Sequence, residues 1–120
     1  MKVCVCGSRY WKDKDYVNEK LDSLLQYVED PSTVTILEGG ATGVDAFAKE
    51  YATAKKMNCQ EYPADWDKLG KAAGPIRNEK MIKDCNWVIA FLQKGKENKG
   101  TQNAIAQAKK LKKVLFIFEN

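Results

Sequence analysis

The sequence predicts an α/β protein with a three-layer, Rossmann-like fold, in which helices cover both faces of a doubly wound parallel sheet of about five strands. Short apolar, β-branched runs alternate with segments of helical periodicity, and this alternation calls for a parallel sheet. The length of 120 residues suits one domain, residues 1–120. We expect the strand order 3-2-1-4-5, which places a topological switch point between the first and fourth strands. Ligands bind at such points, outside the carboxyl ends of the strands.

The first half of the chain contains two strand–helix units. The apolar run 2–6 predicts the first strand, and a stripe of leucines and valines at helical spacing follows, with Asp13 or Asp15 as the cap. Residues 33–37 are β-branched and apolar, which is typical of a buried parallel strand. The helix after this strand is expected to extend from Val44 to about Met57.

The second half continues the alternation. Residues 59–62 predict a weaker strand at an edge of the sheet, and residues 63–74 form the longest irregular stretch. Pro75 fits the first position of the next helix, because the N–H group that proline lacks would be unpaired there. Strands at 87–92 and 114–118 enclose a last helix, which Thr101 is expected to cap.

The composition excludes several kinds of site. The chain has no histidine, which removes the commonest general base and the commonest metal ligand. Cys4 and Cys6 share one face of a strand, and no matching second pair completes a metal site. We interpret these two, Cys59 and Cys85 as small buried apolar residues in a reducing compartment, and we expect neither a metal nor a cofactor.

Hydropathy and charge indicate where the protein acts. No apolar run approaches the length of a membrane span, and the chain opens directly into a strand, so we expect a cytoplasmic protein with no membrane partner. The net charge of +4 comes from eighteen lysines and two arginines, and the lysine pairs fall at predicted helix C-termini. Solvated helix ends explain these lysines better than a nucleic-acid surface does, although weak binding to nucleic acid stays open.

A glycine turn follows the second strand, over Glu38-Gly39-Gly40-Ala41-Thr42-Gly43-Val44-Asp45. Glycines let a ligand lie against bare backbone, and the next helix directs its unpaired N–H groups to the same place, which is the geometry of an anion site. A tight turn that binds nothing is the alternative. Thr42 and Asp45 have the spacing of a capping box, and a helix N-terminus is expected to lower the pKa of Asp45.

The other unusual residues also follow strands, so they are expected at the same carboxyl edge of the sheet. The candidates are Gly7, Ser8 and Arg9, the turn from Gly39 to Asp45, Asp65 and Trp66, Arg77 and Asn78, and Lys99, Gly100 and Thr101. Both arginines are among them, and guanidinium groups suit bidentate recognition of phosphate or carboxylate. The helix at Thr101 has no acid in its first turn, so Lys99-Gly100-Thr101 is the better phosphate cradle. Asp45 would cap its own helix or accept from a ribose hydroxyl.

Arg77 and two tryptophans each have two interpretations. Arg77 is expected in the first turn of its helix, where a cation opposes the dipole, and residues placed against local preference tend to be functional. An ion pair with Asp65 or Glu79 is the alternative. Trp11 and Trp66 fall in loops, where either could stack on a base or pack as a lid, and Trp66 is the slightly favoured base platform.

These motifs, with Pro63-Ala64-Asp65-Trp66, resemble those of the YspA-like branch of the SLOG superfamily, which is named for the Smf/DprA DNA-processing proteins and the LOG phosphoribohydrolases. The resemblance spans nearly the whole chain. It implies a Rossmann-like fold and a ligand derived from a nucleotide, such as ADP-ribose, NAD or a cyclic relative. LOG enzymes carry a Pro-Gly-Gly-x-Gly-Thr-x-x-Glu motif, whereas Ala104 here occupies the position of its catalytic glutamate.

The resulting prediction is a binding module, a sensor or sequestering protein of a bacterial or phage defence or counter-defence setting, which forms a homo-oligomer. It would hold a nucleotide-derived ligand at the carboxyl edge of the sheet. The expected roles are phosphate lining by Gly39, Gly40, Lys99, Gly100 and Thr101, clamping by Arg9 and Arg77, and contact with the sugar by Asp45 or Asn78.

Two alternatives belong to other functional classes. One is a nucleotide N-glycosidase related to LOG, in which Asp45 and Arg77 would act, with Glu38 and Asp65 as further candidate acids. With a lowered pKa, Asp45 would be a poor general acid, suited mainly to stabilising a sugar cation. The other alternative is a DprA-like nucleic-acid-handling protein.

Overall fold

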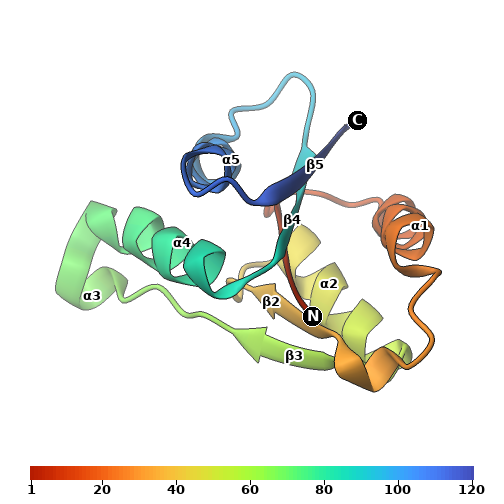
Figure 1. Cartoon of the computed structure of the whole chain (residues 1–120). Helices are drawn as coiled ribbons and strands as arrows, with labels where there is room; N and C mark the ends of the chain where they lie inside the picture. The colour runs from red at the N-terminus through yellow and green to blue at the C-terminus, as the bar shows by residue number, and fades with distance from the viewer.

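The computed structural model describes residues 1–120 and contains one five-stranded sheet (Figure 1). Its strands are β1 (Lys2–Gly7), β2 (Thr35–Glu38), β3 (Asn58–Glu61), β4 (Trp87–Leu92) and β5 (Val114–Glu119). Their order is β3-β2-β1-β4-β5, and every neighbouring pair is parallel. The predicted fold class and strand order are therefore confirmed, and the switch point lies between β1 and β4.

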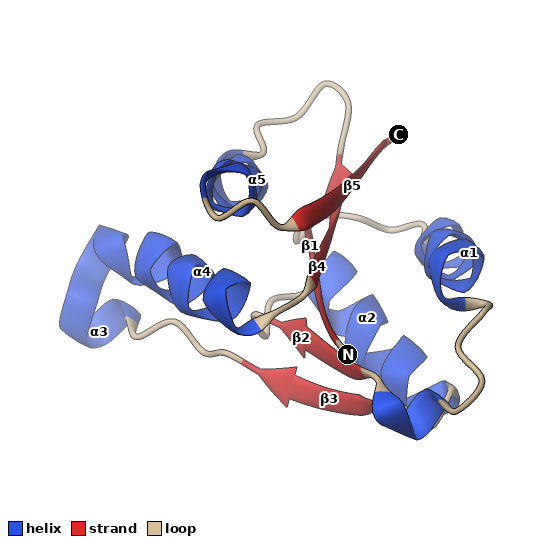
Figure 2. Cartoon of the chain, viewed as in Figure 1, coloured by secondary structure: helices blue, strands red, loops and turns tan.

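Helices cover both faces of this sheet (Figure 2). They are α1 (Lys14–Leu25), α2 (Val44–Ala54), α3 (Trp66–Leu69), α4 (Ala73–Asp84) and α5 (Lys99–Lys110), with short 3-10 turns at Pro31–Thr33 and Gly70–Ala72. Helices α1 and α2 pack on one face, whereas α4 and α5 pack on the other, with α3 beside the amino end of α4. None of these helices is both long and apolar enough to span a membrane.

Alternate residues of the central strands supply the two halves of the core. Val3, Val5 and Ile89 face α1 and α2, while Cys4 and Ala90 face α4 and α5. The register Cys4↔Val88 and Val5↔Ile89 places like residues side by side on each face. Because both faces are covered, the two central strands are apolar almost throughout, as expected for a buried parallel sheet.

The core also contains a residue that the sequence places in a loop. Trp11 is only 5% exposed, and its ring centroid lies 5.8 Å from that of Phe91. Its backbone N–H donates to the carbonyl of Ser8, which turns the chain after β1 inward. Trp11 therefore packs in the core and presents no ring for base stacking. The expectation of four buried cysteines is wrong for Cys59, which is exposed because β3 is an edge strand.

Two helices begin earlier than predicted. Helix α4 starts at Ala73, so Pro75 is its third residue, still within the first turn, where N–H groups have no helical partner. Helix α5 starts at Lys99 and not after a Thr101 cap, since Asn98 precedes it and bonds through its side chain to the backbone of Gln93 and Lys96. Thr101 is instead a buried residue of the first helical turn.

Candidate functional site

The segments that follow β1, β2 and β4 are joined at the carboxyl edge of the sheet. The carbonyl of Ser8 accepts from the N–H of Val44 at 3.2 Å, and the hydroxyl of Thr42 donates to the carbonyl of Arg9 at 3.0 Å. The Ser8 hydroxyl donates to Gln93 Oε1 at 2.9 Å. Gly43 has a φ of 73°, and a Cβ there would collide with the Ser8 carbonyl. This close approach requires glycine.

Arg77 joins the glycine turn after β2 to the segment after β3. Its Nη1 donates to the carbonyls of Gly39, at 2.8 Å, and of Tyr62, at 3.3 Å, and its Nε donates to Asn78 Oδ1 at 2.9 Å. Since α4 begins at Ala73, Arg77 lies in the second turn, and the expected conflict with the helix dipole does not arise. The ion pair considered as the alternative is also not formed, because Glu79 pairs with Lys83. Only Nη2 of this guanidinium is left without a protein partner.

Asn78 connects α4 to the start of α5. Its side chain is buried, and Nδ2 donates to the carbonyl of Gly100 at 3.2 Å and to Asn103 Oδ1 at 3.1 Å. Arg77 and Asn78 thus bind the glycine turn on one side and the start of α5 on the other. The structure therefore holds these two predicted phosphate-binding segments on either side of one short stretch of α4.

The start of α5 is uncapped. No side chain accepts from its first N–H groups, and its first turn contains no acidic residue. The amides of Lys99, Gly100 and Thr101 consequently have no protein acceptor. No neighbouring atom lies within 4 Å of a Cβ built on Gly100, so the backbone is open there. Unpaired N–H groups and the positive end of a helix dipole together favour an anion.

The glycine turn differs, because its own carboxylates use its donors. The N–H of Gly40 donates to Glu38 Oε1 at 3.0 Å, and the N–H of Ala41 donates to Asp45 Oδ2 at 3.3 Å. The predicted capping box is not formed, since Gly43 precedes α2 and Thr42 bonds elsewhere. An anion would find fewer free N–H groups here than at α5.

Asp45 is an unusual carboxylate for a helix N-terminus. It is 7% exposed, and burial raises its pKa to about 6, against the lowering by the Ala41 N–H, the Arg77 guanidinium and the Gly39 N–H. The prediction of a lowered pKa was based on the helix dipole, and it is wrong because removal of the side chain from water outweighs that effect.

Glu38, which the sequence offers as a further candidate acid, is the last residue of β2. It is 1% exposed, its Oε2 has no hydrogen-bond partner, and burial, followed by repulsion from Asp45 and Glu61, raises its pKa to about 7. The sequence did contain a signal for this buried acid, because a glutamate directly follows the apolar residues of a buried strand. No group of three or more Asp, Glu or Cys side chains is arranged to hold a metal ion.

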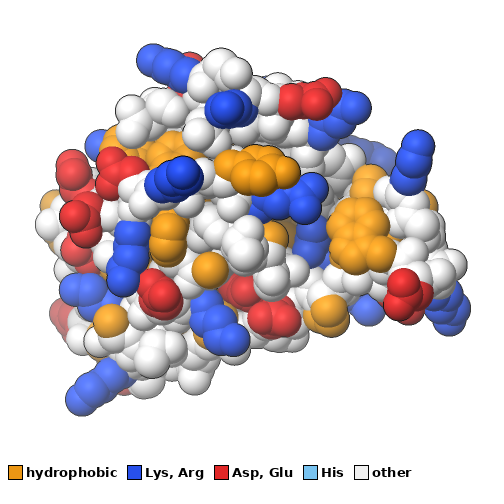
Figure 3. Space-filling model, turned by 180° about the vertical axis from the view of Figure 1, so that it is seen from behind, with side chains coloured by type: hydrophobic (Ala, Val, Ile, Leu, Met, Phe, Trp, Pro, Cys, Tyr) orange, Lys and Arg blue, Asp and Glu red, His pale blue; other side chains and the backbone are white.

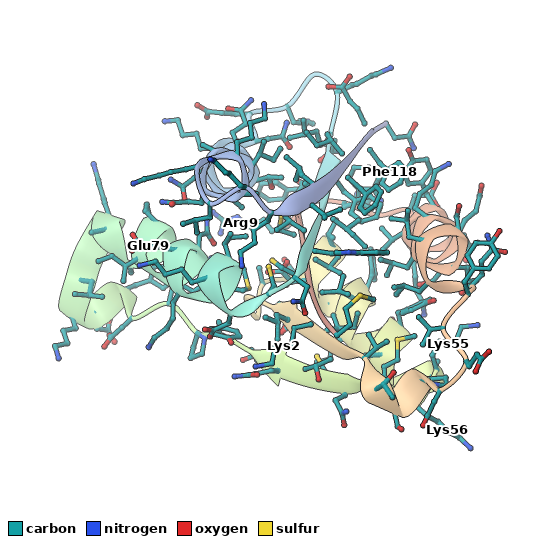
Figure 4. The ribbon with its side chains drawn as sticks, in the orientation of Figure 1. Lys2, Arg9, Lys55, Lys56, Glu79 and Phe118 are labelled. Carbon is teal, nitrogen blue, oxygen red and sulfur yellow. The ribbon has the colours of Figure 1, made fainter.

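Arg9 is the arginine that is free to meet a ligand. It is exposed, its guanidinium lies 5.5 Å from the ring centroid of Tyr10, and it makes no ion pair. In Figure 4 it lies far from Lys55 and Lys56, which follow α2 at the other end of the molecule.

Trp66 is the first residue of α3 and is 59% exposed. A Cβ on Gly74 would lie 3.1 Å from its ring, so one edge of the ring rests on α4 while the rest remains open. Asp65 caps α3 by accepting from the N–H of Lys68, which gives this candidate acid a structural role. The ligand-binding roles of all these residues remain predictions.

Comparison with known proteins gives the family. The model of the YspA, cpYpsA-related SLOG family matches residues 1–69. The gene 61 protein of Mycobacterium phage D29 is 30% identical over 114 residues, which cover 91% of this chain and 89% of that protein. The chain belongs to this SLOG family.

Two solved structures have the same fold as this SLOG protein. DNA processing protein A from Helicobacter pylori, described for its single-stranded DNA binding mode, superposes with a TM-score of 0.71 at 20% identity, over 98% of this chain and 64% of that one. DprA from Streptococcus pneumoniae superposes with a TM-score of 0.58 at 16% identity, over 95% of this chain and 57% of that one. The SLOG chain thus spans less than two thirds of either.

These structures correct the expectation against a nucleic-acid partner. Both matched proteins process DNA, and the first binds it as a single strand. The expectation was based on lysines at helix C-termini, which say nothing of the carboxyl edge, where Arg9 and the start of α5 lie. Nucleic acid therefore returns as a candidate partner.

Proposed function

We propose that this SLOG protein binds a nucleotide-derived ligand through its phosphate at the carboxyl edge of the sheet. The observation that carries the proposal is the uncapped start of α5, where three consecutive amides lack acceptors. Asn78 bonds to this helix end through the Gly100 carbonyl, and the adjacent Arg77 bonds to the glycine turn through the Gly39 carbonyl. A phosphate that accepts from Lys99, Gly100 and Thr101 would gain both hydrogen bonds and the dipole.

The structure suggests a division of roles between the two arginines. Arg9 has its guanidinium free to pair with phosphate, whereas Arg77 uses three of its five N–H donors on the protein. Arg77 would then position the site and add one contact through Nη2. Asp45, whose Oδ2 already accepts from Ala41, would accept from a sugar hydroxyl.

A thermal-shift screen against nucleoside mono- and diphosphates, NAD, ADP-ribose and cyclic dinucleotides tests the proposal. A ligand present at 100 times its Kd stabilises the folded state by about 2.7 kcal/mol, so even weak ligands raise the Tm at millimolar concentration. Lys2→Ala, at the amino end of the sheet, should keep this shift, whereas Arg9→Ala should reduce it. If no nucleotide raises the Tm of the wild type, the proposal is wrong.

Single-stranded DNA is a second candidate ligand. The fold match to the Helicobacter pylori protein favours it, and the same cradle would bind a backbone phosphate. We expect fluorescence anisotropy with labelled oligo-dT to show binding. The logarithm of the association constant should fall linearly with the logarithm of the salt concentration. Binding that is absent at low salt would leave only the small-molecule ligand.

Hydrolysis of an N-glycosidic bond is favoured by one observation, the pKa of Asp45. A carboxyl group with a pKa of about 6 exchanges protons near neutral pH, so the argument that Asp45 is a poor general acid no longer holds. Incubation with nucleoside monophosphates, followed by chromatography for free base, tests this activity. Release by the wild type and not by Asp45→Asn would establish an enzyme, and no release would leave binding alone as the proposed function.

A further inference from the structure

A cavity of about 550 Å³ opens between the segments that follow β1 and β4. Tyr10 and Lys12 line it from the segment after β1, Gln93 and Lys96 from the segment after β4, and Asn120 from the end of β5. It therefore lies at the switch point between β1 and β4, where ligands bind in sheets of this order. Its volume is within the range of small-molecule sites.

The cavity offers hydrogen-bond donors and an aromatic face. The N–H of Tyr10 donates to Ser8 Oγ, and this hydroxyl donates to Gln93 Oε1, which leaves Gln93 Nε2 as the free end of the amide. Lys12 and Lys96 take part in no ion pair. The one acid on the wall, Asp13, caps α1 by accepting from the N–H of Tyr16. The free groups of this cavity thus suit an anion.

The aromatic face belongs to Tyr10, which is 66% exposed. Its neighbour Arg9 is not part of the lining, but its guanidinium lies 5.5 Å from the centroid of the same ring. Figure 3, which views the molecule from behind, shows that Lys and Arg side chains gather near hydrophobic side chains on that face. An aromatic surface beside cations is the arrangement that binds bases and backbone phosphates of a nucleotide chain.

We propose that this cavity binds the adjoining nucleotide of a ligand made of two linked nucleotides, with its base on Tyr10 and its phosphate near Lys12 and Lys96. The inference rests on the proposed function, since the first nucleotide would occupy the start of α5. Arg9, whose guanidinium lies against the Tyr10 ring, would contact the linking phosphate. Single-stranded DNA and a small dinucleotide share this chemistry.

The test compares affinities for thymidine 5′-monophosphate, the dinucleotide pdTdT and NAD by isothermal titration calorimetry. The wild type should bind pdTdT or NAD at least about 10-fold more tightly than the monophosphate. Tyr10→Ala should lose about 5- to 150-fold of the affinity for the dinucleotide, the range for one base on an aromatic ring, and less than 2-fold for the monophosphate. Tyr10→Phe should retain both affinities, and so should Tyr27→Ala, whose exposed tyrosine lies beyond α1.

Preference for pdTdT indicates single-stranded DNA as the source of the ligand, and preference for NAD indicates a pyrophosphate-linked small molecule. Equal wild-type affinities for the monophosphate and both dinucleotides overturn the second site and leave the proposed function standing. The same holds if Tyr10→Ala weakens all ligands in proportion. Absence of any nucleotide binding overturns both.

Discussion

At the scale of single residues, the two arginines have different environments. Arg9 meets no acid, while Arg77 joins the carbonyls of Gly39 and Tyr62 and the side chain of Asn78. These bonds hold the turn after β2 and the segment after β3 against α4. The sequence marked both arginines as clamps, and it could not distinguish them because the partners of Arg77 come from distant parts of the chain.

We expect the two alanine variants to separate binding from stability. Arg9→Ala should weaken nucleotide binding by about 1.5–3 kcal/mol, the range for a charged hydrogen bond, with an unchanged free energy of unfolding. Arg77→Ala should lower the free energy of unfolding by about 1–3 kcal/mol, because partly buried carbonyls lose their donor. Calorimetry and urea unfolding measure the two quantities. A variant Arg77→Ala that is as stable as the wild type but does not bind would assign the clamp to Arg77.

Glu38 makes the free energy of unfolding depend on pH, in a direction that its raised pKa determines. Its pKa of about 7 in the folded state exceeds the ordinary value of 4.5, so its protonated form stabilises the fold fully below pH 4.5, and this contribution is lost as the pH rises through 7. At about 1.4 kcal/mol per pKa unit, the loss is about 3 kcal/mol. The raised pKa of Asp45 acts in the same direction, and its contribution to the free energy of unfolding is lost as the pH rises through about 6.

Glu38→Gln should therefore match the wild type at pH 4 and exceed its free energy of unfolding at pH 8. Urea unfolding of both proteins at the two pH values measures this difference. Glu29→Gln, which changes an exposed glutamate, should follow the wild type at both. A wild type that gains stability between pH 4 and pH 8 would show that Glu38 is ionised and paired.

At the scale of elements, α2 and α5 differ in whether an acidic side chain lies at the positive end of the helix dipole. Asp45 lies in the first turn of α2 and neutralises its dipole, whereas α5 begins with Lys99, Gly100 and Thr101 and has no cap. A helix that leaves its own N-terminus unsatisfied gives up stability that a cap would supply, about 0.5–2 kcal/mol. We infer that this end of α5 is kept open for a ligand.

Gly100→Asp should consequently raise stability and lower affinity together. The new carboxylate fits, because no atom lies within 4 Å of a Cβ at this position, and it favours the helix dipole by about 0.3–1 kcal/mol. The same charge repels a phosphate. Gly100→Asn is the matched neutral control, and it should retain most of the affinity. Thermal unfolding and nucleotide titration of the two variants give the comparison, and equal affinities would show that phosphate does not bind at α5.

At the scale of the whole molecule, the sheet was predictable and the details of its edge were not. Hydrophobic periodicity located the strands, including the bounds of β4 and the exposed edge strand β3, because burial repeats along the sequence. The strand order followed from the usual topology of doubly wound sheets. Glycines and polar residues after each strand were expected at the carboxyl edge, and the structure joins the glycine turn and the start of α5 there through Arg77 and Asn78. The environment of each side chain there depends on tertiary contacts that no local pattern carries.

Three residues show what was missing. Trp11 turns into the core because its N–H bonds to Ser8, which a propensity for loops cannot reveal. The start of α5 is set by the side-chain bonds of Asn98 across its loop. Asp45 keeps a raised pKa because α2 and the glycine turn bury it, an effect that overrides the helix dipole.

A backbone amide NMR titration with a nucleoside monophosphate tests the central claim most directly, since it reports each N–H group separately. Binding of phosphate at the carboxyl edge predicts the largest shifts at Lys99, Gly100 and Thr101, smaller shifts at Arg9 and the glycine turn, and none at Lys55 and Lys56. Shifts centred on Lys55 and Lys56, or no shifts at millimolar nucleotide, would contradict a phosphate site at the start of α5.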